Sequence, residues 1–353
     1  MRIPIRLPTI RVDNVDVEAV LPARKHFRLP FKIARIWLEG WGYRKKITIS
    51  GSSGAGKNYQ VLLKVGESSG ATGAHFHVEG HSAIFPSGKN NSGDLRFTDD
   101  DKTTLLSFWV ESVTGTSPNR VAYCWVKVAD DLGTNRDIYC YYGNSNATNV
   151  SNGNDTFVFF DDFLGTTLDT TKWVIGGKIE GGTVIVSDDT VKIVASAVAN
   201  DKGIRSLSSF TGGYSLRMKV KRRPGGVYHI WAGFNTSDTW EVELVDFTMP
   251  FRVEEAQPNF FYVSGNGTNY QVGEWNKAKD FFFHIVEAKR TGTADNFVLD
   301  ANTATGAYPT NLARYIELRD FRHTGGIECD WVLLRKYVSP EPEFYLAGPE
   351  EQY

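Results

Sequence analysis

The stretch ITISGSSGAGKNYQVLLKV, residues 47–65, decides between two fold classes. Gly51, Gly56 and Lys57 stand at the spacing of a phosphate-binding loop, which would be followed by a helix. Such a loop needs Ser or Thr directly after the lysine to hold Mg²⁺, and here Asn58 follows. The next residues alternate between apolar and polar, as in a half-buried strand. The stretch therefore predicts two strands joined as a hairpin by a Gly/Ser turn, and no nucleotide site.

Short strand-like segments separated by Gly, Asn, Asp and Pro continue on both sides of this stretch. Examples are DLRFTD, RVAYCWVKV and DIYCYYG in the first half, then VKIVAS, YSLRMKVKR and CDWVLLRKY in the second. No long stretch shows a helical period. Each predicted sheet has one apolar face, and two such faces must be buried against each other. The sequence therefore predicts an all-β protein of two β-sandwich (jelly-roll type) domains in series, at 41–155 and 156–338.

The two ends of the chain differ from this strand-rich body. Residues 1–40 carry prolines that break any long element, and Arg and Lys recur between aliphatic residues. Such a segment cannot bury a core alone. We expect an extended basic arm that docks on another copy or on a partner, with a flexible tail as the alternative. Residues 339–353 are Pro-rich and polar and predict an extended C-terminal tail.

The composition excludes several classes of protein. The 39 Lys and Arg residues balance 41 Asp and Glu residues, so no overall field favours nucleic acid or a membrane surface. No apolar run reaches the length of a membrane span, and the N-terminus lacks the apolar core of a secretory signal. Three cysteines are too few for a disulfide framework. Cys124 and Cys140 would lie opposite each other in a second predicted hairpin, where we expect reduced core thiols, with a disulfide as the alternative.

Two resemblances to known families follow from longer phrases of the sequence. WGYRKKITISG, DLRFTDDDKTTLLSFWVES and IYCYYGNSNATNVSNG resemble an uncharacterised domain family, DUF2341, over about residues 41–155. That family occurs in archaeal and bacterial surface proteins and in some virus proteins, and it implies no catalytic residues. FFDDFLGTTLDTTKW and IECDWVLLRKYVSPEPEF resemble the first and last strands of concanavalin A-like (laminin-G-like) domains, at about 156–338. Binding modules and laminarinase-type glycoside hydrolases share that fold, so this resemblance implies no activity by itself.

The segment WEVELVDF is the candidate catalytic motif. Its Glu241, Glu243 and Asp246 have the spacing of the E-x-D-x-x-E motif of laminarinase-type enzymes, with the acid types permuted. Retaining hydrolysis needs two carboxyls about 5–5.5 Å apart. Asp246 in place of Glu shortens one arm by a methylene, and the Trp and Gly pattern that surrounds the motif in those enzymes is missing. We therefore expect solvated acids and no catalysis, with these three residues as the catalytic set of the alternative.

The segment AHFHVEGH is a candidate metal site. His75, His77, Glu79 and His81 occupy every second position and would line one face of a strand, where imidazoles and a carboxylate suit Zn²⁺. Gly80 indicates that the strand ends there, so a solvated polar edge is the alternative.

The concanavalin A-like resemblance implies a second metal site, because Ca²⁺ often ties the first strand of that fold to the last. The matching carboxylates are Asp161 and Asp162 in the opening strand and Asp330 in the closing strand. Carboxylate and carbonyl oxygens suit Ca²⁺. The alternative is that these are ordinary Asp residues at strand ends.

Aromatic side chains supply the candidate sugar-binding surface, because exposed flat rings stack on the C–H faces of pyranoses. Most aromatic residues of a sandwich lie in its core, which is the alternative at each position. The candidates are Tyr228, Trp231, Trp240, Tyr262, Tyr270 and Trp275.

Surface-type sandwiches without a recognisable leader predict a non-enzymatic virion structural protein, a tail, fibre or capsid-surface component of a phage or archaeal virus. Residues 1–40 would anchor it to other copies or other virion proteins, and the second sandwich would bind a glycan or host surface. It would assemble in the host cytoplasm, with no nucleic-acid partner and no membrane insertion. The alternatives are a cell-surface carbohydrate-binding or adhesion protein and a glycoside hydrolase of the laminarinase-like clan.

Overall fold

The computed structural model describes residues 10–12, 15–17, 37–177, 181–196, 201–225, 229–236, 240, 244–254, 256–322 and 325–353. The chain divides into two units, Met1–Ile36 and Trp37–Tyr353. In the first unit, β1 (Ile10–Val12) pairs antiparallel with β2 (Val15–Val17). The rest of the predicted basic arm, up to residue 36, lies outside the described residues. Its docking on another copy therefore stays a prediction.

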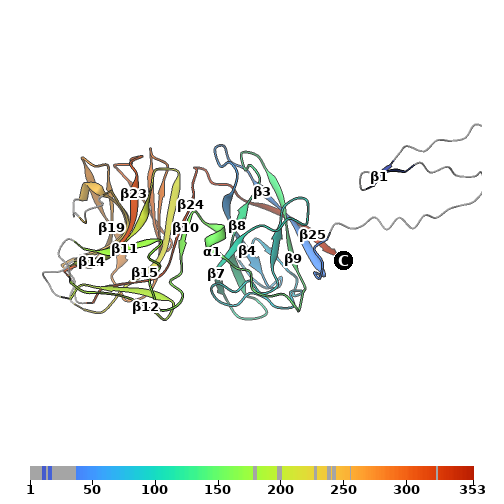
Figure 1. Ribbon diagram of the computed structural model, residues 1–353, viewed down its shortest axis with the longest axis horizontal. Helices are drawn as coiled ribbons and strands as arrows, with labels where there is room; N and C mark the ends of the chain where they lie inside the picture. Colours follow the sequence, from blue (N-terminus) through green and yellow to red (C-terminus); the bar gives the residue numbers. More distant parts are fainter. Residues whose placement is uncertain are drawn as a thin grey trace, which may run out of the picture. The chain divides into compact units, whose positions relative to one another are not determined.

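Two sheets form the first sandwich of the second unit (Figure 1). One sheet has the order β25 (Glu343–Gln352), β3 (Tyr43–Ser50), β9 (Arg136–Tyr142), β6 (Arg96–Thr98). The other has the order β5 (Phe76–His77), β4 (Tyr59–Gly66), β8 (Val121–Val128), β7 (Phe108–Thr114). Apolar side chains from both sheets, among them Ile47, Leu63, Val126 and Ile138, are fully buried between them.

The C-terminal segment belongs to this first sandwich. β25 pairs antiparallel with β3, from Glu343 opposite Ser50 to Gln352 opposite Tyr43. The predicted tail at 339–353 is therefore extended, but it serves as an edge strand. Because β25 follows the second sandwich in sequence, the second sandwich is inserted into the first, between β9 and β25.

The strands on both sides of Gly51 are present, but they do not pair. β3 lies in one sheet and β4 in the other, so the predicted hairpin is wrong. Lys57 lies in the connection between the two sheets, and a strand follows it, as predicted. The reason is that both strands have an apolar face, and these two faces meet across the core. An alternating pattern fixes which face is buried, but it does not fix the neighbouring strand.

The two cysteines of the second predicted hairpin follow the same rule. Cys124 lies on β8 and Cys140 on β9, which belong to opposite sheets. Both are free and fully buried in the core between the sheets. Burial raises the pKa of both thiols, which keeps them protonated. The expected reduced thiols are therefore present, but they approach each other across the sandwich and not along one sheet.

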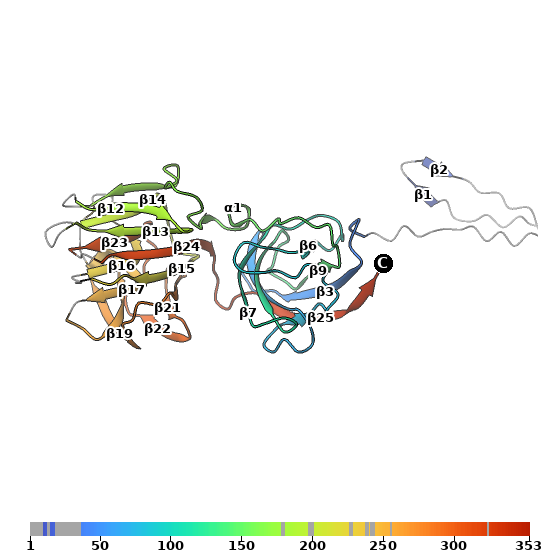
Figure 2. The ribbon, with the colours of Figure 1, turned by 90° about the horizontal axis from the view of Figure 1, so that it is seen from below.

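The second sandwich also has two sheets, named here the inner and the outer sheet. The inner sheet has the order β12 (Thr183–Ser187), β13 (Thr190–Val194), β24 (Ile327–Lys336), β15 (Tyr214–Arg222), β20 (His284–Arg290), β21 (Asp295–Leu299), β22 (Asn302–Gly306), and β10 (Phe159–Asp161) also pairs with β24. The outer sheet has the order β11 (Trp173–Gly176), β14 (Asp201–Phe210), β23 (Arg314–Phe321), β16 (His229–Asn235), β17 (Phe247–Glu254), β18 (Asn259–Gly265), β19 (Tyr270–Ala278). Figure 2 shows the two sheets stacked in the same order, from β12 and β14 to β22 and β19.

Helix is nearly absent from the described part of the chain. Those residues contain one short α-helix, α1 (Gly153–Thr156), and one 3-10 turn, η1 (Leu244–Asp246). The Asn152 side chain caps α1 by accepting a hydrogen bond from the Asp155 amide. None of the described helices is long and apolar enough to cross a membrane. The predicted all-β class with two sandwiches is confirmed.

Candidate functional site

The face of the inner sheet that points away from its own core is buried against the first sandwich. Trp109 and Trp125 of the first sandwich form an aromatic cluster with Phe160, Trp331 and Leu333. The ring centroid of Trp109 lies 5.5 Å from that of Trp331 and 5.0 Å from that of Phe160. This contact removes one sheet face of the second sandwich from solvent. A binding surface on the second sandwich therefore has to be sought on the opposite face.

The residues of the predicted Ca²⁺ site contribute to this contact between the sandwiches. The carboxylate of Asp330 accepts hydrogen bonds from Lys89 of the first sandwich and, at 2.6 Å, from Lys219. Asp162 accepts from the side chain of Asn90, also in the first sandwich. Two ammonium groups thus neutralise the Asp330 carboxylate without a metal.

The third predicted Ca²⁺ ligand, Asp161, has other partners again. Its carboxylate accepts from Trp173 Nε1 at 2.7 Å and from the Phe163 amide at 2.8 Å. Burial raises its pKa, and these two hydrogen bonds oppose the rise. Within the described ranges, no cluster of three or more His, Cys, Asp or Glu side chains could hold a metal ion. The geometry therefore gives the predicted Ca²⁺ no common ligand set there.

The residues of the predicted Zn²⁺ site do not line one face. β5 ends at His77, and Glu79 has a positive φ of 52°, so the strand pattern stops as Gly80 indicated. Each side chain has a different partner: His75 stacks on Phe344, His77 bonds the Ala71 carbonyl, Glu79 pairs with Lys45, and His81 bonds Glu350. Burial lowers the pKa of His75 to about 4. The four side chains act as separate packing contacts of the first sandwich.

The face of the outer sheet that points away from the core, called here the outer face, carries arginine, aromatic and acidic side chains in register. One row across the strands pairs Gly176 with Gly203, Gly203 with Arg319, Arg319 with Trp231, and Trp231 with Arg252. In the next row, Arg205 lies opposite Glu317. A merely solvated strand face would carry scattered short polar residues. This one instead places fixed charges beside flat rings.

Arg319 is the centre of the charges on the outer face. Its guanidinium pairs with Asp201 and lies 3.6 Å from Glu317, and all three side chains are at most 1% exposed. Glu317 also accepts from Trp231 Nε1 at 2.7 Å and from Asn235 Nδ2 at 2.9 Å. Both carboxylates are therefore buried and held by donors. They stabilise the face and are not exposed to a substrate.

Trp240 lies flat on this face because two paired strands have glycine beneath it. A Cβ on Gly176 would fall 2.5 Å from Trp240 Nε1, and one on Gly203 would fall 2.8 Å from its ring. The Trp240 carbonyl accepts a hydrogen bond of 2.9 Å from Arg319. Its φ of +63° is unusual for a bulky residue. Such a conformation persists only where its surroundings enforce it, and it is often found at functional sites.

Arg205 extends the Trp240 surface toward Tyr315. The guanidinium carbon of Arg205 lies 5.4 Å from the Trp240 ring centroid and 4.7 Å from that of Tyr315. Trp240, Arg205 and Tyr315 are all half-buried, so each presents part of its side chain to solvent. We name these three residues the aromatic platform.

The structure separates the predicted sugar-stacking residues. Trp231 and Trp275 are each 2% exposed, so the prediction that they stack on sugar is wrong. Trp231 is covered by Phe247, Met249 and Val263 on the outer face, and Trp275 lies in the core. Trp240 remains accessible, whereas Tyr228 lies outside the described residues.

Of the predicted catalytic set, Glu241 and Glu243 also lie outside the described residues. Asp246 ends η1, is half-buried, and accepts a hydrogen bond of 2.6 Å from Thr236 Oγ1. Sequence reasoning missed Arg205, Glu317 and Arg319. The available signal was the alternation in RYIELRDF, where every second residue of β23 is aromatic or charged.

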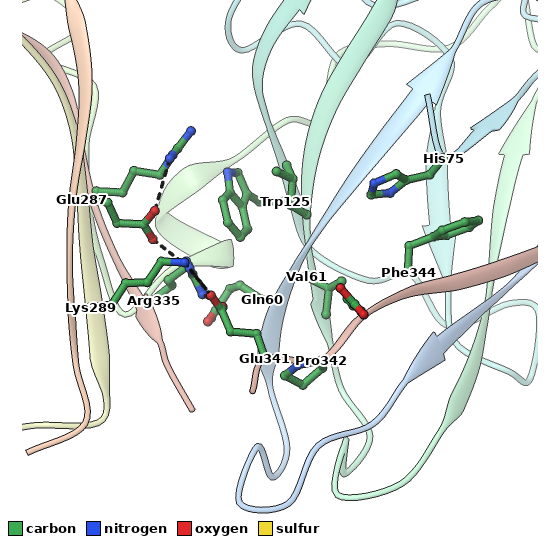
Figure 3. A pocket seen from close by; sticks show the side chains of 13 residues that line it. Gln60, Val61, His75, Trp125, Glu287, Lys289, Arg335, Glu341, Pro342 and Phe344 are labelled. Carbon is green, nitrogen blue, oxygen red and sulfur yellow. Dashed lines mark hydrogen bonds and ion pairs between the residues drawn. The ribbon is translucent and has the colours of Figure 1, made fainter. Parts of the chain in front are cut away.

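A polar cleft of about 290 Å³ lies between the two sandwiches (Figure 3). Glu287, Lys289 and Arg335 enter it from the inner sheet, Gln60 and Trp125 from the first sandwich, and Glu341 from the connection to β25. Its charges alternate in sign: Glu111 pairs with Arg217, Arg217 and Arg335 both pair with Glu287, and Arg335 and Lys289 both pair with Glu341. Each charge is thus neutralised by the protein, and the cleft acts as a polar seam.

Glu287 makes this seam sensitive to acid. Burial by itself would raise the pKa of Glu287, but Arg335 and Arg217 overcome that effect and lower the pKa to about 2. Between about pH 4.5 and pH 2 the unfolded chain therefore binds a proton that the folded chain does not. Stability is present above this window and is lost as the pH falls through it.

We expect wild type to lose on the order of 3 kcal/mol of unfolding free energy from this one group as the pH falls from 4.5 toward 2. Glu287→Gln should be less stable than wild type at pH 7, because two buried arginines lose a carboxylate, but its stability should change less over that window. Denaturant titrations at pH 7, 5, 4 and 3 measure the difference. Parallel pH profiles for the two proteins would contradict the assignment to Glu287.

The comparisons with known proteins identify one family in part of the chain. The model of a domain of unknown function, DUF2341, matches residues 91–176. The predicted resemblance to that family is confirmed, with a match that begins and ends later than 41–155. No curated protein matches the sequence.

Solved structures that resemble this chain are glycan-active enzymes, and each covers about half of it. A structure described with endo-acting O-glycanases of the human gut microbiota has 15% identity and a TM-score of 0.41, covering 52% of this chain and 100% of its own. The endo-β-1,3-glucanase of Pyrococcus furiosus has 11% identity and a TM-score of 0.40, covering 52% and 95%. A glycosyl hydrolase family 16 protein of Mycobacterium smegmatis has 13% and 0.38, covering 50% and 99%. Likeness at this level assigns no activity to the chain.

These findings correct the predicted function. The prediction of a virion structural protein is wrong, because the structures that the chain resembles are glycoside hydrolases and glycanases. The expectation that the chain is not an enzyme gains no support from them either.

Proposed function

We propose that the second sandwich binds carbohydrate on its outer face. The observation that carries this proposal is the aromatic platform, in which the half-exposed Trp240 indole is fixed over the Gly176–Gly203 pair beside Arg205 and Tyr315. A flat ring stacks on the C–H face of a pyranose. The neighbouring guanidinium and phenol supply donors for sugar hydroxyls or carboxylates.

The platform is organised before any sugar arrives. Arg319 holds the Trp240 carbonyl, and Arg319 is itself fixed by Asp201 and Glu317. The glycines allow the indole to rest on the strand backbone, where any larger residue would displace it. A preorganised ring loses little conformational freedom on binding, which favours affinity.

Replacing Trp240 tests the proposal. The full chain is first screened on an oligosaccharide array that includes β-1,3-glucans and O-linked glycans. The best ligand is then titrated by calorimetry. Trp240→Ala removes the stacking surface and should weaken binding at least about tenfold, since burying one aromatic side chain contributes roughly 1.5–3 kcal/mol.

Tyr345→Ala is the matched control. Tyr345 is an aromatic residue of β25 in the first sandwich and is 61% exposed. Its replacement should leave the affinity unchanged. Absence of binding to any arrayed glycan, or unchanged affinity in Trp240→Ala, would contradict the proposal.

Glycoside hydrolysis is the second candidate function, and one observation favours it. Asp246 is half-buried and is held by Thr236 in η1, whose Leu244 packs against the cluster on the outer face. The third acid of the predicted motif is thus beside the proposed binding face. Because Glu317 and Asp201 are both paired with Arg319, catalysis would depend on Glu241, Glu243 and Asp246.

A reducing-end assay separates binding from hydrolysis. The full chain and Glu241→Gln are incubated with laminarin, a soluble β-1,3-glucan, and with the array-selected glycan. Cleavage by the full chain that is lost in Glu241→Gln would establish the hydrolase. Binding without cleavage would leave the carbohydrate-binding proposal standing and remove the hydrolase.

A further inference from the structure

A loop far from the platform in sequence exposes two adjacent phenylalanines. The loop joins β19 to β20, and its Phe281 and Phe282 side chains are 46% and 75% exposed. Single exposed apolar residues are normal on protein surfaces, but contiguous ones mark contact sites. The two rings therefore require a partner that the fold itself does not supply.

The loop is held in this conformation by its own polar contacts. The Asp280 carboxylate accepts from the Phe282 amide at 2.9 Å and bonds His284 Nε2 at 2.8 Å. The Lys279 amide donates to the Pro258 carbonyl at 2.9 Å. Because both ends of the loop are fixed, Phe281 and Phe282 are kept pointing outward and do not fold back onto the sandwich.

Cationic side chains border the exposed rings. The guanidinium carbon of Arg222 lies 4.0 Å from the centroid of the Phe281 ring, and its Nε donates to the Asp280 carbonyl at 2.9 Å. Lys221 Nζ lies 4.3 Å from the centroid of the Phe283 ring. Lys221 also pairs with Glu328, so its charge is partly offset, whereas the acceptor of Arg222 is a neutral carbonyl. A positive rim around an apolar tip fits a partner that is apolar inside and negative at its surface.

We propose that residues 279–283 dock the second sandwich on the surface of a lipid bilayer that contains anionic lipids. A side chain that is three-quarters exposed is not enclosed by a shallow groove and has to enter the partner itself. Aromatic side chains partition into the headgroup and acyl boundary, and each Lys or Arg near an anionic surface adds about 1 kcal/mol. This is docking at the interface, not insertion of a spanning segment, and it does not depend on the proposed carbohydrate binding.

Vesicle co-sedimentation of the full chain tests this proposal. The vesicles are phosphatidylcholine alone, or phosphatidylcholine with about one third phosphatidylglycerol. Wild type should bind the anionic vesicles, and the double variant Phe281→Ser/Phe282→Ser should bind them at least about tenfold more weakly. Arg222→Gln should weaken binding to the anionic vesicles about fivefold and leave binding to phosphatidylcholine unchanged.

Leu207→Ser is the control, because Leu207 is an exposed apolar residue of β14, on the other sheet, and should have no effect. Thermal unfolding of each variant checks that the fold is kept. Wild type that fails to bind anionic vesicles, or that binds neutral vesicles equally well, would overturn the proposal. So would undiminished binding by the Phe281→Ser/Phe282→Ser variant, because another segment, such as the basic residues before 40, would then be responsible.

Discussion

Arg319→Ala is expected to destabilise the second sandwich by about 3–5 kcal/mol. The guanidinium pairs with Asp201 and also lies beside Glu317, and both carboxylates are buried. Removing a single cation therefore leaves two negative charges close together in a low-dielectric environment. It also removes the donor that holds the Trp240 carbonyl, so the aromatic platform should lose its order.

Chemical denaturation followed by circular dichroism measures this effect. Arg136→Ala is the control, because Arg136 is 40% exposed and its nearest carboxylate, Asp130, lies 3.9 Å away. An exposed pair of this kind contributes little, so its loss should change stability by less than about 0.5 kcal/mol. A loss below about 1 kcal/mol in Arg319→Ala would show that the cluster on the outer face is not the stabilising element described here.

Trp331→Ala is expected to cost about 3–5 kcal/mol and to uncouple the two sandwiches. Trp331 is 1% exposed and packs its ring against Trp109 of the first sandwich. The cavity left behind would lie in the contact between the sandwiches, next to the polar seam. Wild type should unfold in one calorimetric transition, and the variant should show two.

Trp240→Ala serves as the comparison, since it removes the same type of side chain from the same sandwich but away from that contact. It should lower the melting temperature less and should not split the transition. If Trp331→Ala unfolded in a single transition with wild-type stability, the contact would not couple the two sandwiches.

The sequence predicts the strands well because each half-buried strand carries its own alternating pattern. Strand pairing is a different matter. β3 and β4 are adjacent in sequence and lie in opposite sheets, and the same holds for β8 and β9. β25 completes the first sandwich after the whole second sandwich has intervened. Local patterns contain no information about such long-range partners.

The candidate site could be predicted only in part, for a related reason. Trp240 and Trp231 look alike in sequence, and both lie on the outer face. Trp231 is covered by neighbouring apolar side chains, whereas Trp240 stays half-exposed. The glycines that support Trp240, Gly176 and Gly203, become neighbours only when β11 pairs with β14. Burial and register, which decide the outcome, are set by tertiary contacts.

The predicted metal ligands show the same limit for charged residues. Asp330 matches a family position for Ca²⁺, yet its partner is Lys89, 241 positions earlier in the chain. A carboxylate can be satisfied by a metal or by an ammonium group, and sequence alone does not distinguish the two. Only the docking of the two sandwiches brings that lysine to it.

Hydrogen–deuterium exchange of the full chain, with and without the array-selected oligosaccharide, tests the central claim most directly. The account predicts slower exchange in β14 and β23, which carry Arg205, Tyr315 and Arg319, with no change in β4 and β8 of the first sandwich. Protection confined to the first sandwich or to the cleft around Glu287, with β14 and β23 unaffected, would contradict the assignment of carbohydrate binding to the outer face.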